Sequence, residues 1–108
     1  MLDRLLQVLG TTGYLFTACR WDHNPPAPYG TAQLEGGADS VAADDRIIHQ
    51  GIRASVDLYA PSAQSSYPSA VQSVLDGAYA WRLNSVQYED YDDTHLVHYE
   101  WIVEAEEL

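Results

Sequence analysis

The sequence predicts an α+β domain, with a mostly antiparallel sheet of four to five strands and two helices packed on one face. Apolar residues alternate with others over Ile52–Tyr59 and again over Thr94–Ala105, which is the two-residue period of a half-buried strand. Over about Ala63–Ala80 the apolar residues instead recur at helical spacing. A length of 108 residues suffices for one hydrophobic core but not for two, so we expect a single domain over 1–108.

The N-terminal segment is expected to form a short amphipathic helix followed by a strand. Leucines recur at helical spacing and two glycines then end the helix, in the order Leu2, Leu5, Leu6, Leu9, Gly10 and Gly13. A helix of about two turns is not stable alone, so it must dock on the domain or on a neighbour. Tyr14–Trp21 is rich in aromatic and β-branched residues and predicts a strand, in which Cys19 is expected to be a buried, small apolar residue.

A proline-rich loop comes next along the chain. Asp22–Pro28 cannot be a helix or an inner strand, because proline lacks the N–H donor that both need, and three prolines stand here at Pro25, Pro26 and Pro28. Tyr29–Leu34 then predicts a strand, and Glu35–Ser40 predicts a turn. Arg46–Gln50 is a further strand candidate, which leads through Gly51 into the central strand.

The central strand and the helix after it form the predicted core. The core-facing residues of the strand are Ile52, Ala54, Val56 and Leu58. Pro61 ends the strand, since proline gives no donor to a sheet ladder. The apolar stripe of the helix is formed by Val71, Val74, Leu75 and Ala78.

Two strands, Trp81–Tyr88 and Thr94–Ala105, are expected to close the domain, joined by a polar turn at Glu89–Asp93. In the last strand, the predicted core face carries Val97, Tyr99, Trp101, Val103 and Ala105. The opposite face carries Leu96, His98, Glu100, Ile102 and Glu104. Because this second face mixes acidic with apolar residues, it is expected to be an interface.

The charge balance excludes several classes of function. There are 16 acidic residues against 5 basic ones, giving a formal net charge of −11, so we expect no specific binding to nucleic acid. A strongly negative surface is expected after Arg82, at Glu89, Asp90, Asp92 and Asp93 above all. The single cysteine excludes an internal disulfide framework and suits a reducing compartment. No apolar run reaches the length of a membrane span, and we expect a soluble protein that is intracellular where it is made.

The residues that carry chemistry form no recognisable catalytic or metal motif. His95 and His98 are three apart on a predicted strand and therefore point to opposite faces, so they cannot act together as metal ligands. The acidic run at Glu89–Asp93 lacks the ligand spacing of a calcium loop, and it is expected to be a solvated turn. There is no nucleophile motif, no phosphate-binding glycine loop and no lysine. We therefore expect a non-enzymatic protein with no cofactor.

The order of these features resembles the small tail terminator, or tail completion, proteins of long-tailed bacteriophages, which join tail to head. The resemblance covers most of the chain from Pro25 onward. It rests on the proline-rich loop Asn24–Tyr29, the segment Ala43–Arg46, the long strand that ends in Asp57–Tyr59, the helix, and the closing strands around Tyr88–Asp90 and His98–Trp101.

The resemblance implies a virion structural protein of the tail or neck, made in the host cytoplasm. Such a protein is expected to form a hexameric ring that caps the head-proximal end of the tail tube and stops its polymerisation. Its partners would be other copies of the chain, the tail tube protein and the head–tail connector protein. The candidate interface residues are Pro25, Pro26, Pro28, Tyr29, Leu96, His98, Glu100 and Ile102, and the candidate acidic lumen or surface is formed by Glu89, Asp90, Asp92 and Asp93.

Two alternatives stay open from the residues. A small acidic protein can instead be a DNA mimic that inhibits a nucleic-acid-binding protein, and the acidic stretch after Arg82 supports that reading. A metal-dependent hydrolase that uses His98 and Glu100 is the weakest hypothesis. The assembly state separates the first two functions, because a mimic is expected to be a monomer or dimer.

Overall fold

The computed structural model describes residues 2–37, 42–43, 46–47, 52–91 and 94–105. The elements follow one another as α1 (Asp3–Gly10), β1 (Leu15–Ala18), β2 (Tyr29–Gly37), β3 (Ala42–Ala43), β4 (Arg46–Ile47), β5 (Ile52–Ala60), α2 (Ser66–Asp76), β6 (Ala80–Tyr91) and β7 (Thr94–Ala105). The predicted strands at Arg46–Gln50 and the predicted turn at Glu35–Ser40 lie partly outside the described residues, as do Asp92 and Asp93.

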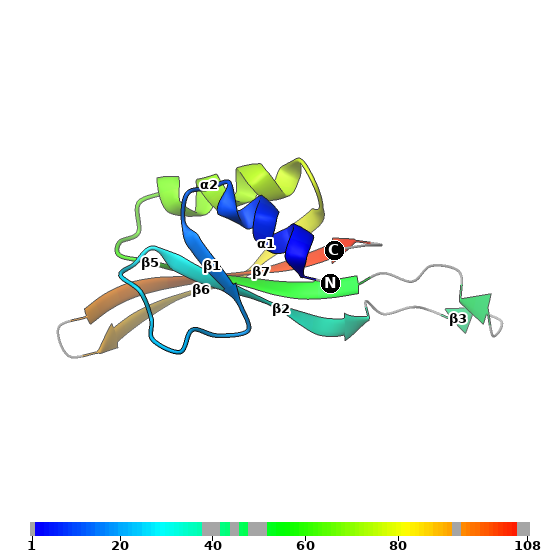
Figure 1. The fold of residues 1–108 in the computed structure, drawn as a ribbon, viewed down its shortest axis with the longest axis horizontal. Helices are drawn as coiled ribbons and strands as arrows, with labels where there is room; N and C mark the ends of the chain where they lie inside the picture. Colours follow the sequence, from blue (N-terminus) through cyan, green and yellow to red (C-terminus); the bar gives the residue numbers. More distant parts are fainter. Residues whose placement is uncertain (1, 38–41, 44–45, 48–51, 92–93, 106–108) are drawn as a thin grey trace.

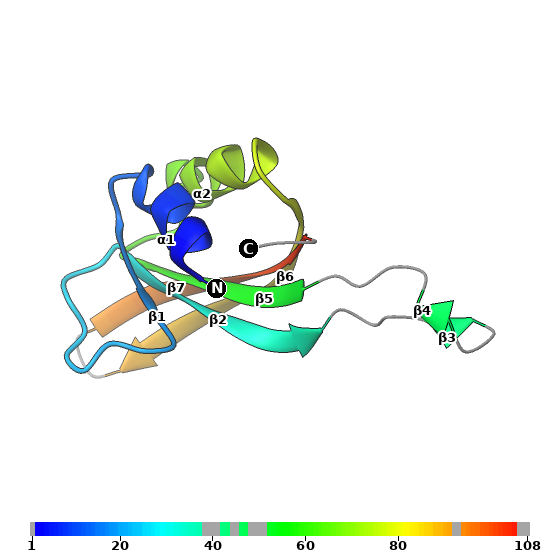
Figure 2. The same cartoon turned by 45° about the vertical axis from the view of Figure 1, so that its right-hand side comes forward.

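Five strands form one sheet in the order β1-β2-β5-β7-β6 (Figure 1). The β2–β5, β5–β7 and β7–β6 pairs are antiparallel, and β1–β2 is parallel. The prediction of an α+β fold with a mostly antiparallel sheet and two helices is confirmed. Figures 1 and 2 show α1 and α2 on the same side of this sheet.

Strand β5 pairs with β7 over its whole length, and one face of this pair forms the sheet side of the core. Ala54 lies opposite Val103, Val56 opposite Trp101 and Leu58 opposite Tyr99. Residues opposite each other in an antiparallel pair share a face, so these apolar side chains gather under the helices. The buried residues include Ala54, Val56, Leu58, Ala60, Val97, Tyr99, Trp101 and Val103, which confirms the predicted core faces of both strands.

The helices cover this face of the sheet with leucine and valine side chains. Leu5 and Leu9 of α1 and Val71 and Leu75 of α2 are fully buried. Helix α2 is shorter than its apolar spacing predicts, and Pro68 gives the reason: in a helix interior its ring would clash with the carbonyl four residues earlier, whereas the first turn tolerates it. The helix therefore begins at Ser66.

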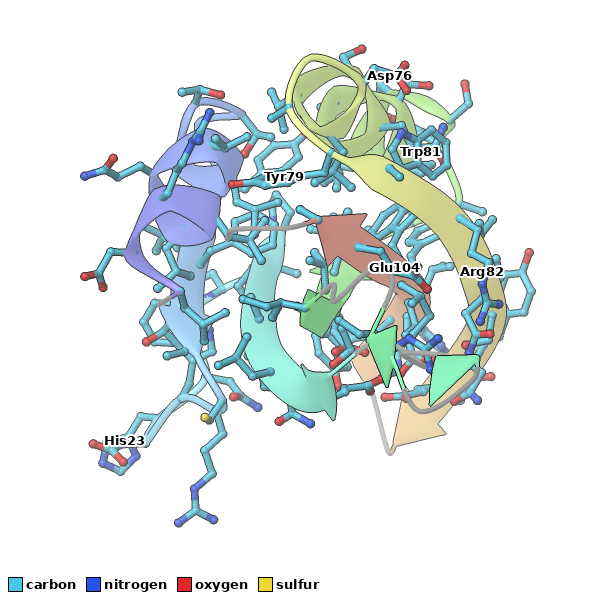
Figure 3. The ribbon with its side chains drawn as sticks, turned by 90° about the vertical axis from the view of Figure 1, so that its right-hand side faces the viewer. His23, Asp76, Tyr79, Trp81, Arg82 and Glu104 are labelled. Carbon is cyan, nitrogen blue, oxygen red and sulfur yellow. The ribbon has the colours of Figure 1, made fainter. Side chains whose placement is uncertain are left out.

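Hydrogen bonds from tryptophan tie α2 to the sheet. The Trp101 indole donates to Gln72 at 3.2 Å and the Trp81 indole donates to Asp76 at 2.6 Å. Figure 3 shows Trp81 beside Asp76 at the end of α2, with Tyr79 between the two helices. The buried Trp101 indole N–H needs such a partner, whereas the Trp81–Asp76 bond is exposed, and both bonds link α2 to the strands.

Three local predictions are wrong. Cys19 is exposed and has a φ of 63°, because β1 ends at Ala18 and the chain turns there, with the Arg20 amide donating to the Ala18 carbonyl. Glu35–Gly37 continue β2, and Glu89–Tyr91 continue β6. Glu89–Tyr91 are strand residues because β7 supplies a partner for each: Glu89 pairs with Leu96, and Asp90 pairs with His95. In β2, Gly37 pairs with Ile52 of β5.

The remaining two strands form a separate small sheet. β3 and β4 pair antiparallel, with Ala42 opposite Ile47 and Ala43 opposite Arg46. Figures 1 and 2 both draw this pair beyond the ends of β2 and β5, away from the five-stranded sheet. β3 and β4, which we call the hairpin arm, thus lie outside the five-stranded sheet.

Candidate functional site

The sheet face opposite the helices carries the polar side chains. Alternation along β5 and β7 places Asp57 and Tyr59 on this face together with His98 and Glu100, because the residues between them fill the core. On β6, Gln87 and Glu89 lie opposite His98 and Leu96 and so share the same face. Three neighbouring strands therefore bring acidic side chains around one histidine.

His98 is held between two carboxylates from different strands. Its Nε2 lies 2.6 Å from Oδ1 of Asp57 on β5, and its Nδ1 lies 3.1 Å from Oε2 of Glu89 on β6. The side chains of His98 and Asp57 are each 16% exposed, so the cluster is largely screened from water. Ionised carboxylates only accept hydrogen bonds, so both contacts are satisfied together when the imidazole is protonated on both nitrogens.

The carboxylates favour that charged form. The hydrogen bond to Asp57 raises the pKa of His98 above its usual 6.5, with help from Glu89, although burial acts in the opposite direction. Because both ring nitrogens are already engaged, the imidazole is arranged as a bridge between β5, β6 and β7. A general base would need one nitrogen directed at a substrate.

Aromatic rings extend this cluster toward β2. The Tyr59 ring stacks on His98 with centroids 4.2 Å apart, and Tyr29 stacks on Tyr59 at 5.1 Å. Burial, together with the charges of Asp57 and Glu89, raises the pKa of Tyr59 to about 12. Burial and Glu89 also raise the pKa of Tyr29. Both phenols are therefore neutral at physiological pH and can donate hydrogen bonds.

A cleft of about 430 Å³ opens beside the stacked tyrosines. The sheet contributes Tyr29, Tyr59, Leu96 and Glu89 to its lining. Its other side is the loop after β1, including Arg20, Trp21 and Asn24. The Trp21 indole donates to the Gly30 carbonyl at 3.0 Å, which fastens this loop to β2. Amphipathic aromatic rings of this kind are enriched at protein interfaces.

The predicted interface residues occupy different environments within the fold. Tyr29 and Leu96 line the cleft, and His98 lies behind it in the carboxylate cluster. Pro26 is exposed, while Pro25 and Pro28 are half-buried in the loop, with a cis peptide bond between Ala27 and Pro28. The cleft is therefore lined by Asn24 of the predicted loop, by Tyr29 and by Leu96, whereas the three prolines are not among its lining residues.

Two other predicted residues, Glu100 and Ile102, lie further along β7. Glu100 is half-buried and accepts a 2.6 Å hydrogen bond from the Asn84 amide. Ile102 is only 6% exposed within the single chain. Its apolar character therefore needs no partner to explain it; Tyr29 is equally buried, at 5% exposed, and the interface role of both residues stays a prediction.

The predicted acidic surface is divided. Glu89 belongs to the His98 cluster, whereas Asp90 lies at the exposed end of β6, where its Oδ1 is 2.5 Å from Nδ1 of His95. Asp92 and Asp93 lie outside the described residues. Among the residues that the structure describes, no group of three His, Cys, Asp or Glu side chains converges in a way that could hold a metal ion. Within the same part of the chain, neither helix has the length and hydropathy of a membrane span.

Sequence reasoning missed the cluster of Asp57, His98 and Glu89. The alternation of β5 and β7 did indicate that Asp57 and His98 each lie on a polar face. It does not predict which residues of the two strands lie opposite each other. The predicted turn placed Glu89 in a loop, which removed it from the sheet altogether.

The comparisons with known proteins add no identification. A scan against protein-family models gives no match, and a search of curated proteins gives no significant match.

Proposed function

We propose that this chain is an assembly subunit of a bacteriophage tail, which forms a ring, caps the head-proximal end of the tail tube and joins it to the head connector. The observation that carries the proposal is the hairpin arm, whose β3–β4 ladder stands away from the five-stranded sheet. A two-stranded ladder of this size is not stable alone in water, so it needs a surface to rest on. In a ring, that surface belongs to a neighbouring subunit or to the tube.

The cleft supplies a second contact site of the kind that a ring or cap requires. It combines Asn24 of the proline-rich loop with Trp21, Tyr59 and Leu96, and amphipathic aromatic side chains of this kind are enriched at interfaces. A head-to-tail ring uses two different patches on each subunit, and the arm and the cleft are two such patches. The net charge of −11 also suits a ring through which DNA passes without binding.

The decisive experiment compares the native masses of the full chain and a short-arm variant. Gly37 and Ile52 are cross-strand partners, so residues 38–51 can be replaced by an Asn-Gly turn without moving β2 or β5. We expect the full chain to reach about six subunits by light scattering, alone or on tail tube protein, as a ring of symmetry-related copies should. The short-arm variant should lose that species and keep its circular dichroism spectrum.

A matched control changes the exposed Gln7→Ala on α1, which should leave the assembly unchanged. Rings and capped tube ends should be visible by negative-stain electron microscopy with the full chain only. If the full chain never exceeds two subunits and leaves tube ends uncapped, the proposal that it forms a ring is wrong. Tight binding to a basic nucleic-acid-binding protein in that case would favour the acidic DNA mimic.

A further inference from the structure

Strand β6 leaves one long backbone edge of the sheet open. It spans 12 residues and stands last in the strand order, so within the described residues its ladder runs only to β7. An open edge of this length presents unpaired N–H and C=O groups that can accept another strand.

An apolar stripe follows this edge on the helix side of the sheet. Leu83, Val86 and Tyr88 lie opposite Trp101, Tyr99 and Val97 of β7, and so share their face. The β7 residues are buried, whereas Leu83, Val86 and Tyr88 are 43%, 40% and 72% exposed. The helices thus cover the sheet as far as β7 and leave the β6 stripe open to solvent.

On the opposite face of β6, a basic residue and an acidic residue lie in different halves of the strand. Arg82 lies in the first half of the strand, opposite Ile102, and Glu89 lies in the second half, opposite Leu96. Arg82 donates to the Asn84 side chain at 3.0 Å, and Glu89 contacts His98 through one oxygen. A guanidinium has five N–H donors and a carboxylate has two oxygens, so both groups can form a further bond.

We propose that β6 pairs antiparallel with β6 of a second copy of this chain, about a two-fold axis at Val86. The register of β6 shifts between Leu83 and Ser85, which makes Asn84 the extra residue. If Asn84 has no cross-strand partner in either copy, each residue of β6 lies opposite a residue of the second copy that is on the same face of the sheet. Leu83 then faces Tyr88 of the second copy, and Arg82 faces its Glu89.

Charge complementarity selects a second copy as the occupant. Two subunits of charge −11 repel each other, so a stable contact needs local pairs of opposite sign. Antiparallel pairing places Arg82 of each copy against an acidic residue of the other, while the apolar stripe buries itself on the helix side. Parallel pairing of the same strands would put Arg82 against Arg82 and Glu89 against Glu89.

Cysteine cross-linking tests both the contact and its register. In a Cys19→Ser background, Val86→Cys should form a disulfide-linked dimer of twice the 12.0 kDa chain under mild oxidation, because Val86 lies on the axis. Leu83→Cys alone should not link, since it faces Tyr88 of the second copy, but Leu83→Cys combined with Tyr88→Cys should. Absence of the Val86→Cys dimer, or equal linking by Leu83→Cys alone, would overturn the pairing.

A second measurement does not depend on cysteine chemistry. Val86→Lys places a charge on the axis, and sedimentation velocity at about 0.15 M salt should show the paired species lost, with at least a tenfold weaker association. The matched control is Leu15→Lys, which changes an exposed apolar residue on the opposite edge strand, β1, and should keep the pairing. Equal association of both variants would also overturn the proposal.

The pairing does not rest on the proposed ring. A two-fold contact is isologous, whereas a ring closes through head-to-tail contacts, so the two use different surfaces. If both contacts form, two rings are joined, and the native mass is about twelve subunits where the ring alone gives about six. Cross-linked dimers without rings would contradict the ring proposal and support the β6 contact. Rings without the Val86→Cys disulfide would support the ring proposal and contradict the β6 contact.

Discussion

His98 joins three strands through one side chain. Asp57 on β5 and Glu89 on β6 both contact its ring, and Tyr59 stacks on it. Charged hydrogen bonds in a largely buried site are stronger than neutral ones, and both bonds form at once only when the imidazole is protonated on both nitrogens. The stability contributed by this cluster should therefore depend on pH.

We expect His98→Gln to destabilise the fold by about 2 kcal/mol at about pH 6, and by less at higher pH. The folded-state pKa of His98 is raised, so its contribution is fully present below the unfolded value of 6.5 and is lost as pH rises through the folded pKa. Urea unfolding across this range measures the free energy for both proteins.

The matched control is His95→Gln. The side chains of His95 and Asp90 are 73% and 70% exposed, so this surface pair should contribute well under about 1 kcal/mol. Parallel stability–pH curves for the wild type and His98→Gln would contradict a bridging role for His98.

Among the elements, β2 runs between β1 and β5, and it is closely packed at Gly30. Gly30 pairs with Phe16 on one side and with Leu58 on the other. A Cβ atom at Gly30 would overlap both the Phe16 ring and the backbone carbonyl oxygen of Asp57. The glycine therefore lets Phe16 cross the strand at close range.

Gly30→Ala should lower the free energy of unfolding by about 1–3 kcal/mol, because backbone atoms cannot move aside as a flexible side chain can. Chemical denaturation gives this value directly. Gly10→Ala is the control, since a Cβ there meets nothing within 4 Å at the end of α1, and it should be neutral or slightly stabilising. Equal effects of the two substitutions would show that the packing around Gly30 is looser than the structure has it.

The limits of sequence prediction are clearest in the two closing strands. The alternation over Thr94–Ala105 predicted β7 with its bounds and its core face, because residues on one face repeat every two positions. The acidic composition of Glu89–Asp93 predicted a turn, whereas Glu89, Asp90 and Tyr91 extend β6. A partner strand decided the outcome, since paired backbone groups offset the low strand propensity of Asp and Glu.

The whole molecule combines a high negative charge with few basic side chains. A formal net charge of −11 on 108 residues produces self-repulsion in the folded state. Local pairs such as Arg53 with Glu104, at 3.2 Å, are half-exposed and weak by comparison.

We therefore expect the folded state to gain stability as salt is added. Between about 0.01 M and about 1 M salt the screening length falls from about 30 Å to about 3 Å, so the repulsion between distant carboxylates should largely vanish. The gain should be on the order of 1 kcal/mol, measured as the shift of the thermal midpoint in sodium chloride. A falling midpoint would mean that local ion pairs, and not overall repulsion, dominate the electrostatics.

The sequence alone determined the positions of the helices, the two long central strands and their core faces, because period and composition are properties of a local segment. It also determined the formal net charge of −11, because charge depends on composition alone. Only the tertiary structure decided that β1 joins β2 in parallel, that Cys19 is exposed, and that Asp57, Glu89 and His98 meet. It also left β6 at an open edge. These features depend on which strands pair and in which register, and that choice is made by contacts between residues far apart in the chain.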